Sequence, residues 1–323
     1  MTTAKKELFI GMDLGGSFIK YAIGDRQGNL LYADKRPSRA DQSQDTIFSV
    51  IYSIVDDLLM HQERLHGQIV AIGFGSPGSV DFEHGRLIGA TPNINDWTDA
   101  DIRGRLEARY GLPTWVDNDA NVMALAEARV GAARGKANVI ALTLGTGIGG
   151  GILIAGEVYR GSDYAGAELG HVSINFLGPK CNCGNFGCIE QYASAPAMLR
   201  LYGQKLHEQN LPVPVELSTF LLFEQVASGQ AAAVETVQEV CAYLGYALAN
   251  LVNIFNPDVI VIGGGVADAD IDLMQQIEKV MKQRALPPAV RHVQVKRAEL
   301  GNRAGQVGAI MLAADAYAAQ RKV

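Results

Sequence analysis

Residues 9–23 read FIGMDLGGSFIKYAI, and residues 139–153 read VIALTLGTGIGGGIL. Each stretch holds an apolar run, a Leu-Gly-Gly or Leu-Gly-Thr turn and a second apolar run, which predicts two strands joined by a tight turn. The two stretches lie about 130 residues apart, one near the start of each half of the chain. Glycine hairpins are common, but this repeat favours a duplicated domain with a phosphate-facing hairpin in each half.

The elements expected around these hairpins alternate between strand and helix, which indicates an α/β fold. A length of 323 residues favours two domains. We expect a smaller α/β lobe of residues 1–118 with a C-terminal helix at 303–323, and a larger lobe of residues 119–302. Outside the hairpins we expect strands at 30–34, 69–75, 113–116, 259–262 and 292–296, and helices at 44–66, 102–110, from DNDAN (117–121) to 130, 231–255, 271–284 and 303–319.

Charge and hydropathy argue against nucleic-acid and membrane partners. The chain has 28 basic and 34 acidic residues, a net charge of −6, and no basic run of the kind that binds nucleic acid. Its N-terminal residues lack the apolar run of a signal peptide. Residues 137–156 are uncharged, but their six glycines and two threonines favour two buried strands over a membrane span. We therefore expect a cytoplasmic protein.

Three of the four cysteines crowd into eight residues, which is poor spacing for a disulfide framework and fits a reducing compartment. With one histidine they form the pattern H-x9-C-x-C-x4-C, made by His171, Cys181, Cys183 and Cys188. Three thiolates and an imidazole suit tetrahedral zinc, and a site closed by four protein ligands is structural. Three unrelated thiols or a redox pair are the alternative. Cys241 lies in an apolar helical pattern and is expected in the core.

The glycines of the second hairpin, GTGIGG at 145–150, match the GxGxxG pattern of dinucleotide sites. That pattern requires a helix to follow, whereas strand-like GILI follows here, so we reject a dinucleotide site. The chain also lacks a Walker A motif and the motifs of protein kinases. Glycine backbones still allow close approach of N–H groups to phosphate, and the same holds for the first hairpin and for Gly263–Gly265. Tight-turn geometry alone is the alternative for each cluster.

Several carboxylates are candidates for chemistry. Asp13 ends a strand beside the first glycine turn and could hold Mg²⁺. Asp117-Asn118-Asp119 begins a helix, where Asp and Asn also serve simply as caps. Glu168 and Glu190 bracket the metal cluster, and paired acceptors of this kind suit a polyhydroxyl ligand.

These motifs together resemble the ROK family of sugar kinases, repressors and related open reading frames. The most specific part is ELGH at 168–171 followed by CNCGNFGCIE at 181–190. The other landmarks occur in the family's order and span nearly the whole chain: DLGGS at 13–17, SPGSVD at 76–81, TPNINDW at 91–97, VDNDAN at 116–121 and LGTGIGGG at 144–151. Ser17 stands where the family often has Thr, and the hydroxyl is kept.

The resemblance implies a two-lobed, actin-like (ribonuclease H-like) ATPase fold and an ATP-dependent kinase acting on the 6-hydroxyl of a free hexose, glucose by preference. It implies Asp119 as the base that accepts the hydroxyl proton. It also implies Mg²⁺, a structural Zn²⁺ and a homodimer or larger homo-oligomer. The implied sugar ligands are Gly78, Asn93, Asn118, Asp119, Glu168, His171 and Glu190; the implied ATP and magnesium contacts are Asp13, Gly15, Gly16, Ser17, Lys20, Gly145, Thr146, Gly147, Gly264 and Gly265.

Two other classes of function stay open at this point. The family includes sugar-responsive repressors, which carry a winged helix-turn-helix ahead of the first hairpin; strand residues from Leu8 leave no room for one here. A catalytically silent sugar sensor or an actin-like ATPase is the second alternative. Among kinases, N-acetylmannosamine, fructose, mannose and allose remain possible substrates, and polyphosphate a possible donor.

Overall fold

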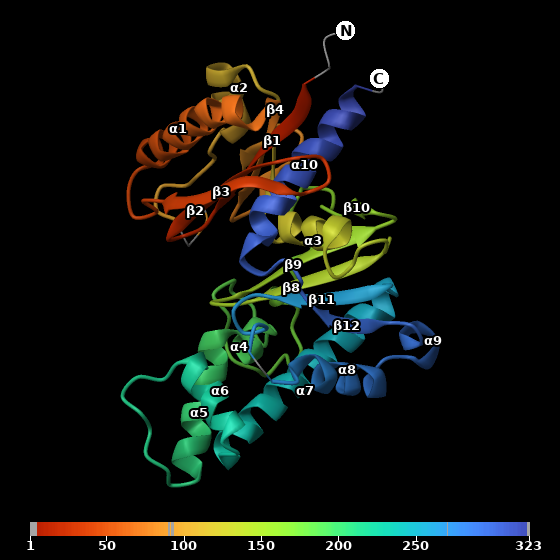
Figure 1. Cartoon of the computed structure of the whole chain (residues 1–323). Coiled ribbons are helices and arrows are strands. Elements are labelled where there is room, and N and C mark those ends of the chain that lie inside the picture. The colour runs from red at the N-terminus through yellow and green to blue at the C-terminus, as the bar shows by residue number, and fades with distance from the viewer. Residues whose placement is uncertain (1–4, 90, 92–93, 270, 322–323) are drawn as a thin grey trace. The chain divides into compact units, whose positions relative to one another are not determined.

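The computed structural model describes residues 5–89, 91, 94–269 and 271–321 (Figure 1). The chain divides into two compact units. The first unit contains residues 1–134, 158–166 and 302–323, and the second contains residues 135–157 and 167–301. The boundary that we expected after residue 118 falls inside the first unit, between a strand and the helix that follows it.

The first unit is built on a five-stranded sheet with the order β3-β2-β1-β4-β7. The strand β1 pairs antiparallel with β2 and parallel with β4, and β4 pairs parallel with β7. This unit also holds a short β5–β6 hairpin and four α-helices among its described residues. The bounds are β1 Lys6–Leu14, β2 Phe18–Gly24, β3 Leu30–Pro37, β4 Gly67–Ser76, β5 Val80–Asp81, β6 Arg86–Leu87, β7 Thr114–Asn118, α1 Gln44–His61, α2 Ile102–Tyr110, α3 Asp119–Val130 and α10 Ala304–Gln320.

Side chains of β1 alternate between two layers of helices, as a strand buried on both faces requires. Leu8 and Ile10 belong to a core cluster shared with α1 and α2. On the other face, the ring of Phe9 meets that of Tyr317 on α10, with centroids 6.1 Å apart. A Cβ atom on Gly11 would overlap the carbonyl oxygen of Gln306, so α10 packs directly on the strand. Figure 1 shows α10 running beside β1.

The second unit carries a sheet with the order β10-β9-β8-β11-β12. Here β8 pairs antiparallel with β9 and parallel with β11, which pairs parallel with β12. One face of the sheet shares a core cluster with α5, α6, α7 and α8. The bounds are β8 Val139–Leu144, β9 Ile148–Ile154, β10 Glu157–Val158, β11 Val259–Gly263, β12 Gln294–Arg297, α4 Glu190–Ala193, α5 Ala195–Glu208, α6 Thr219–Ala227, α7 Ala231–Phe255, α8 Leu273–Arg284 and α9 Pro287–Val290.

The two sheets have the same strand order relative to the chain: three consecutive strands in reverse order, then two later strands that pair parallel on the other side of the first strand. The two stretches of similar sequence form the equivalent hairpins, β1–β2 and β8–β9. The expected duplication is therefore confirmed in the topology. The uncharged residues 137–156 form the second hairpin, and no helix among the described residues is long and apolar enough to cross a membrane.

Two expectations about secondary structure need correction. The helix expected to reach residue 66 ends at His61 and continues as a 3-10 turn, Gln62–Leu65. Gln62 keeps helical backbone angles and its Oε1 accepts a hydrogen bond from the N–H of Ile69 of β4, at 2.8 Å, while the turn ends at His66, which is left-handed with φ 49°. The expectations were also incomplete, since they named no element between residues 190 and 230, where the structure has α4, α5 and α6.

Candidate active site

In the first unit, β7 ends and α3 begins within the DND sequence. The Asn118 side chain caps the helix, with Oδ1 accepting from the backbone N–H of Ala120 at 2.9 Å and of Asn121 at 3.3 Å. Its Nδ2 donates to the carbonyl oxygen of Gly78, at 3.0 Å. Asp119 follows as the first helical residue. Three of the expected sugar-site residues, Gly78, Asn118 and Asp119, are thus gathered at one turn, whereas Asn93 lies outside the described residues.

A second group in this unit surrounds the carboxylate of Asp13, near the carboxyl end of β1. Lys20 is its cross-strand partner on β2, and Lys20 Nζ donates to the Asn302 carbonyl oxygen at 3.4 Å. Burial raises the pKa of Asp13 above its ordinary value, while the charge of Lys20 opposes the shift. The carboxylate lies against Gly305 in the first turn of α10, where a Cβ atom would overlap its oxygen. A helix N-terminus favours anionic groups, so this edge suits the Asp13 carboxylate and a phosphate, and the carboxylate could in turn hold a cation.

The turn of the first hairpin completes this group. Gly15 donates its backbone N–H to the Phe18 carbonyl oxygen at 3.0 Å, which closes the turn. Gly16 and Ser17 are exposed within the turn. The expected contacts to phosphate on this side, Asp13, Gly15, Gly16, Ser17 and Lys20, are therefore neighbours on one hairpin.

In the second unit, the turn of the β8–β9 hairpin has the same construction. Gly145 donates its backbone N–H to the Gly147 carbonyl oxygen at 3.0 Å. The turn after β11 lies beside it, because Val266 donates its N–H to the Leu144 carbonyl oxygen at 3.2 Å. The expected nucleotide residues of this unit, Gly145, Thr146, Gly147, Gly264 and Gly265, are thus brought to one edge of the sheet, at the carboxyl ends of β8 and β11. Ligands gather at such edges in open α/β sheets.

The four expected metal ligands come together in the second unit. The ligand atoms of His171, Cys181, Cys183 and Cys188 all lie within 4.8 Å of one another. The Cys181 sulfur is 3.6 Å from His171 Nδ1, and the Cys183 and Cys188 sulfurs are 3.6 Å apart. Tetrahedral zinc with bonds of about 2.3 Å to sulfur places neighbouring sulfurs about 3.8 Å apart. The cluster therefore fits a structural zinc ion, with Nδ1 of the histidine on the metal side.

The two glutamates that bracket the cluster, Glu168 and Glu190, lie close to the β8–β9 hairpin. Glu190 follows Cys188 closely, and its Oε2 accepts a hydrogen bond from the N–H of Ile148 at 2.9 Å. A Cβ atom on Gly147 would meet the same oxygen, so the carboxylate packs directly on this glycine. Glu168 is exposed just before the 3-10 turn Leu169–His171, which packs on β9. The glycine turn of the β8–β9 hairpin and both glutamates are thus positioned by the same strand, β9.

The predicted residues that the structure describes form two groups in each unit: a sugar group and a phosphate group. Sequence reasoning missed two residues next to them, Gly305 and Arg160, and the ion pair that Arg160 makes with Asp117. Gly305 abuts Asp13, and its only signal was its place near the start of the last helix. Asp117 and Arg160 form a buried ion pair beneath the DND turn, with 2.6 Å between Arg160 Nη2 and Asp117 Oδ2.

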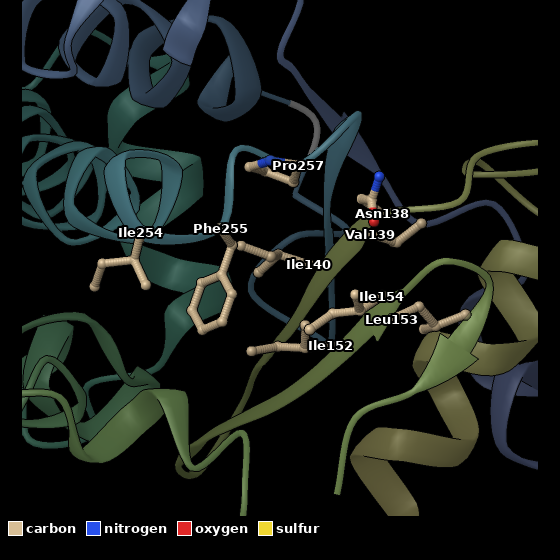
Figure 2. A pocket seen from close by; sticks show the side chains of 9 residues that line it. All are labelled: Asn138, Val139, Ile140, Ile152, Leu153, Ile154, Ile254, Phe255 and Pro257. Atoms are coloured by element: carbon tan, nitrogen blue, oxygen red, sulfur yellow. The ribbon is translucent and has the colours of Figure 1, made fainter. Parts of the chain in front are cut away.

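The second unit also contains an apolar pocket of about 230 Å³, lined by β8, β9 and the end of α7. Figure 2 shows Ile254 and Phe255 of α7 on one side and Ile152 and Ile154 of β9 on the other. Asn138 is the single polar side chain among its nine lining residues, and its Oδ1 accepts a hydrogen bond from Ala155 at 3.1 Å. A pocket of this composition carries no group for acid, base or phosphate chemistry, so the candidate site rests on the four groups above.

The chain is similar to known proteins over nearly its whole length. The model of the ROK family matches residues 9–316. A glucokinase from Halalkalibacterium halodurans is 34% identical over 308 residues, which cover 93% of each chain. The crystal structure of a ROK family glucokinase from Streptomyces griseus in complex with glucose and AMPPNP superposes with a TM-score of 0.79 at 33% identity, covering 95% of this chain and 99% of that one. A putative xylose repressor from Caldicellulosiruptor sp. is 30% identical over 311 residues, covering 94% of this chain and 77% of the repressor.

Two duplicated α/β units, each with a glycine hairpin at the carboxyl edge of its sheet, define an actin-like ATPase fold with a Cys3His cluster that suits structural zinc. The chain belongs to the ROK family.

Proposed function

We propose that this protein is an ATP-dependent hexokinase that transfers the terminal phosphoryl group of ATP to the 6-hydroxyl of glucose. The observation that carries the proposal is the 34% identity to a glucokinase over nearly all of both chains. The four groups of expected site residues described above also support the proposal; Asn93 lies outside the described residues. The solved structure with glucose and AMPPNP contains both kinds of substrate that the proposal requires.

Phosphoryl transfer needs a positioned acceptor and neutralised phosphate charge more than covalent chemistry from the protein. We assign Asp119 as the base that accepts the proton of the 6-hydroxyl. It is the first residue of α3, and its Oδ1 accepts a hydrogen bond from the Ala120 N–H at 2.9 Å. A positioned base of this kind contributes about 10²–10⁴-fold to the rate.

We assign sugar binding to Gly78, Asn93 and Asn118 of the first unit and to Glu168, His171 and Glu190 of the second. Carboxylates and a histidine that has one ring nitrogen on a metal offer acceptors and a donor to sugar hydroxyls. Because Nδ1 of His171 faces the cluster, Nε2 is the nitrogen assigned to the sugar. The zinc ion, when bound, would orient this ring and supply no Lewis acid chemistry.

We assign the ATP phosphates to the two hairpin turns, Gly15 to Ser17 with Lys20, and Gly145 to Gly147. Gly264 and Gly265 are assigned to the nucleotide's adenosine end. Asp13 would hold Mg²⁺ directly or through water, and the ion would neutralise charge on the phosphates. We also propose that the protein is cytoplasmic, takes part in glycolysis and forms a homodimer or a larger homo-oligomer.

The test is a coupled assay of ADP release with a panel of free hexoses. We expect release to depend on added sugar and to have the highest kcat/KM with glucose; mannose, fructose, allose and N-acetylmannosamine are the competing substrates. Replacing ATP by polyphosphate checks the donor. Release that does not depend on sugar would indicate an ATPase and would contradict the proposal.

One comparison favours a second candidate, a sugar-responsive protein without catalysis. The similarity to a putative xylose repressor extends over 94% of this chain. Such a protein would bind a sugar by calorimetry and release no ADP in the same assay. Sugar binding together with turnover would exclude it.

A further inference from the structure

Arg160 lies directly beneath the DND turn of the first unit. Its Nε and Nη2 donate to Oδ2 of Asp117, at 2.9 and 2.6 Å. The guanidinium stacks over the ring of Phe82, with 3.7 Å between its carbon and the ring centroid. The side chains are 18% exposed for Arg160 and 3% exposed for Asp117. A carboxylate buried to this degree requires a partner for its charge, and Arg160 supplies it.

The other oxygen of Asp117 organises the turn itself. Oδ1 accepts from the backbone N–H of Asn118 at 2.8 Å and from Nδ2 of Asn121 at 3.0 Å. Asn118 is the residue whose side chain caps α3 and contacts Gly78, and Asp119 follows it. The chain of contacts therefore runs from Arg160 through Asp117 to the backbone that carries the base. Asp117 is engaged at both oxygens and is not itself a candidate base.

Arg160 also closes the segment in which it lies. The backbone N–H of Gly166 donates to the Arg160 carbonyl oxygen at 2.9 Å, which folds residues 160–166 into a loop. Residues 158–166 belong to the first unit, while residues on either side in the sequence belong to the second. The ion pair thus attaches residues 158–166 to the DND turn of the first unit.

We propose that Arg160 is a positioning residue for phosphoryl transfer: acting through Asp117, it holds the Asn118-Asp119 turn in the geometry that the base requires. This inference rests on the proposed kinase function. Because a misplacement of about 1 Å in a reacting group can cost about 10²-fold in rate, the effect belongs to kcat. Arg160 touches neither substrate in this scheme, so substrate affinity changes little.

The test compares Arg160→Met, Arg160→Lys, Asp117→Asn and the double variant Arg160→Met with Asp117→Asn. We expect Arg160→Met to lower kcat by about 10²-fold with the KM for ATP within about twofold. Arg160→Lys keeps the charge without the fork of donors and should recover part of the loss. The double variant should be no worse than Arg160→Met, because no buried charge is left unpaired. The matched control is Arg129→Met, which removes the α3–α10 ion pair with Asp315, an exposed contact, and should retain wild-type kcat.

Hydrogen exchange gives a readout that does not depend on turnover. The N–H groups of Ala120 and Asn121 are held by Asn118 Oδ1, so Arg160→Met should accelerate exchange in the peptide that contains residues 117–121 but not in α8. If Arg160→Met does not fold, the double variant and Arg160→Lys provide the same comparison.

Three outcomes would overturn the proposal: wild-type kcat with unchanged exchange, losses that add in the double variant, or a raised KM for ATP at constant kcat, which would make Arg160 a phosphate ligand. Failure of the kinase function itself is recognised separately, since wild-type protein would then release no sugar-dependent ADP while the exchange experiment still reports on the turn.

Discussion

Asn118 and Asp119 occupy adjacent positions at the start of α3, but their side chains meet different groups. The Asn118 side-chain oxygen accepts hydrogen bonds at the N-terminus of α3, and its amide nitrogen donates to the carbonyl oxygen of Gly78. Because the capping position is already filled by Asn118, the alternative that Asp119 is only a cap loses its main support. The residue that follows a cap can present its carboxylate to a ligand while the helix dipole stabilises the charge.

We predict that Asp119→Asn lowers kcat by about 10²-fold or more, because the amide keeps the shape but cannot accept the hydroxyl proton. The dissociation constants for glucose and for an ATP analogue should stay close to wild type by calorimetry. Asp45→Asn is the matched control, since Asp45 is also an acid in the first turn of a helix and is 82% exposed. Wild-type turnover in folded Asp119→Asn protein would return Asp119 to a structural role.

Burial of the Asp13 carboxylate carries a free-energy cost when the group is charged. Its pKa is raised by burial, so the folded state binds the proton more tightly than the unfolded state, whose value is near 3.8. The free energy of unfolding must then fall as pH rises from about 3.8 through the folded pKa, and the loss is complete above it.

We therefore predict that Asp13→Asn raises the melting temperature at neutral pH in buffer without Mg²⁺, and that this gain shrinks toward zero as the pH falls toward 3.8. The same variant should lose most ATP-dependent turnover, because the amide is a poor ligand for Mg²⁺. Scanning calorimetry of both proteins at matched pH values measures the difference. Equal melting temperatures at every pH would mean that burying the charged Asp13 carboxylate does not destabilise the folded protein.

At the scale of elements, the β8–β9 hairpin connects the metal cluster with the phosphate turn. Glu190 follows the ligand Cys188 by two residues and accepts a hydrogen bond from Ile148 at the start of β9. The segment of His171 is joined to that of Cys188 by a bridge between Ser173 and Cys188. Metal binding would therefore set the positions of the glutamates and the histidine, while the hairpin keeps its own strand pairing without them.

This arrangement predicts that Cys183→Ala weakens hexose binding by about 10–100-fold, the usual cost of losing a support for a ligand, and weakens ATP binding much less. Zinc content should fall from about one per chain. Separate calorimetric titrations with glucose and with an ATP analogue measure the two effects. Cys241→Ala is the control, because it removes a buried thiol from α7 without touching the cluster.

Equal weakening of both ligands by Cys183→Ala would show that zinc only holds the second unit together. Full zinc content and wild-type hexose affinity in Cys183→Ala would show that Cys183 neither binds the metal nor supports the sugar site. Circular dichroism on each variant separates loss of fold from loss of binding.

At the scale of the whole molecule, the repeat in sequence corresponds to a repeat in topology. Both hairpins carry alternating buried residues around a short glycine turn, and this local pattern needs no tertiary context to form. The metal ligands are also close together in the sequence, so their spacing alone predicted the cluster. The expected strands and long helices were predicted well where apolar periodicity is strong, as in α7.

The α/β class, the duplication, the metal cluster and the family could all be predicted from the sequence, since each depends on local patterns of residues along the chain. Tertiary packing was needed to find α5 and α6, which both pack on α7. It also decided the contacts of Asp13 with Gly305 and of Asp117 with Arg160. Those partners lie 292 and 43 residues apart in the chain, and no local pattern links residues that only folding brings together.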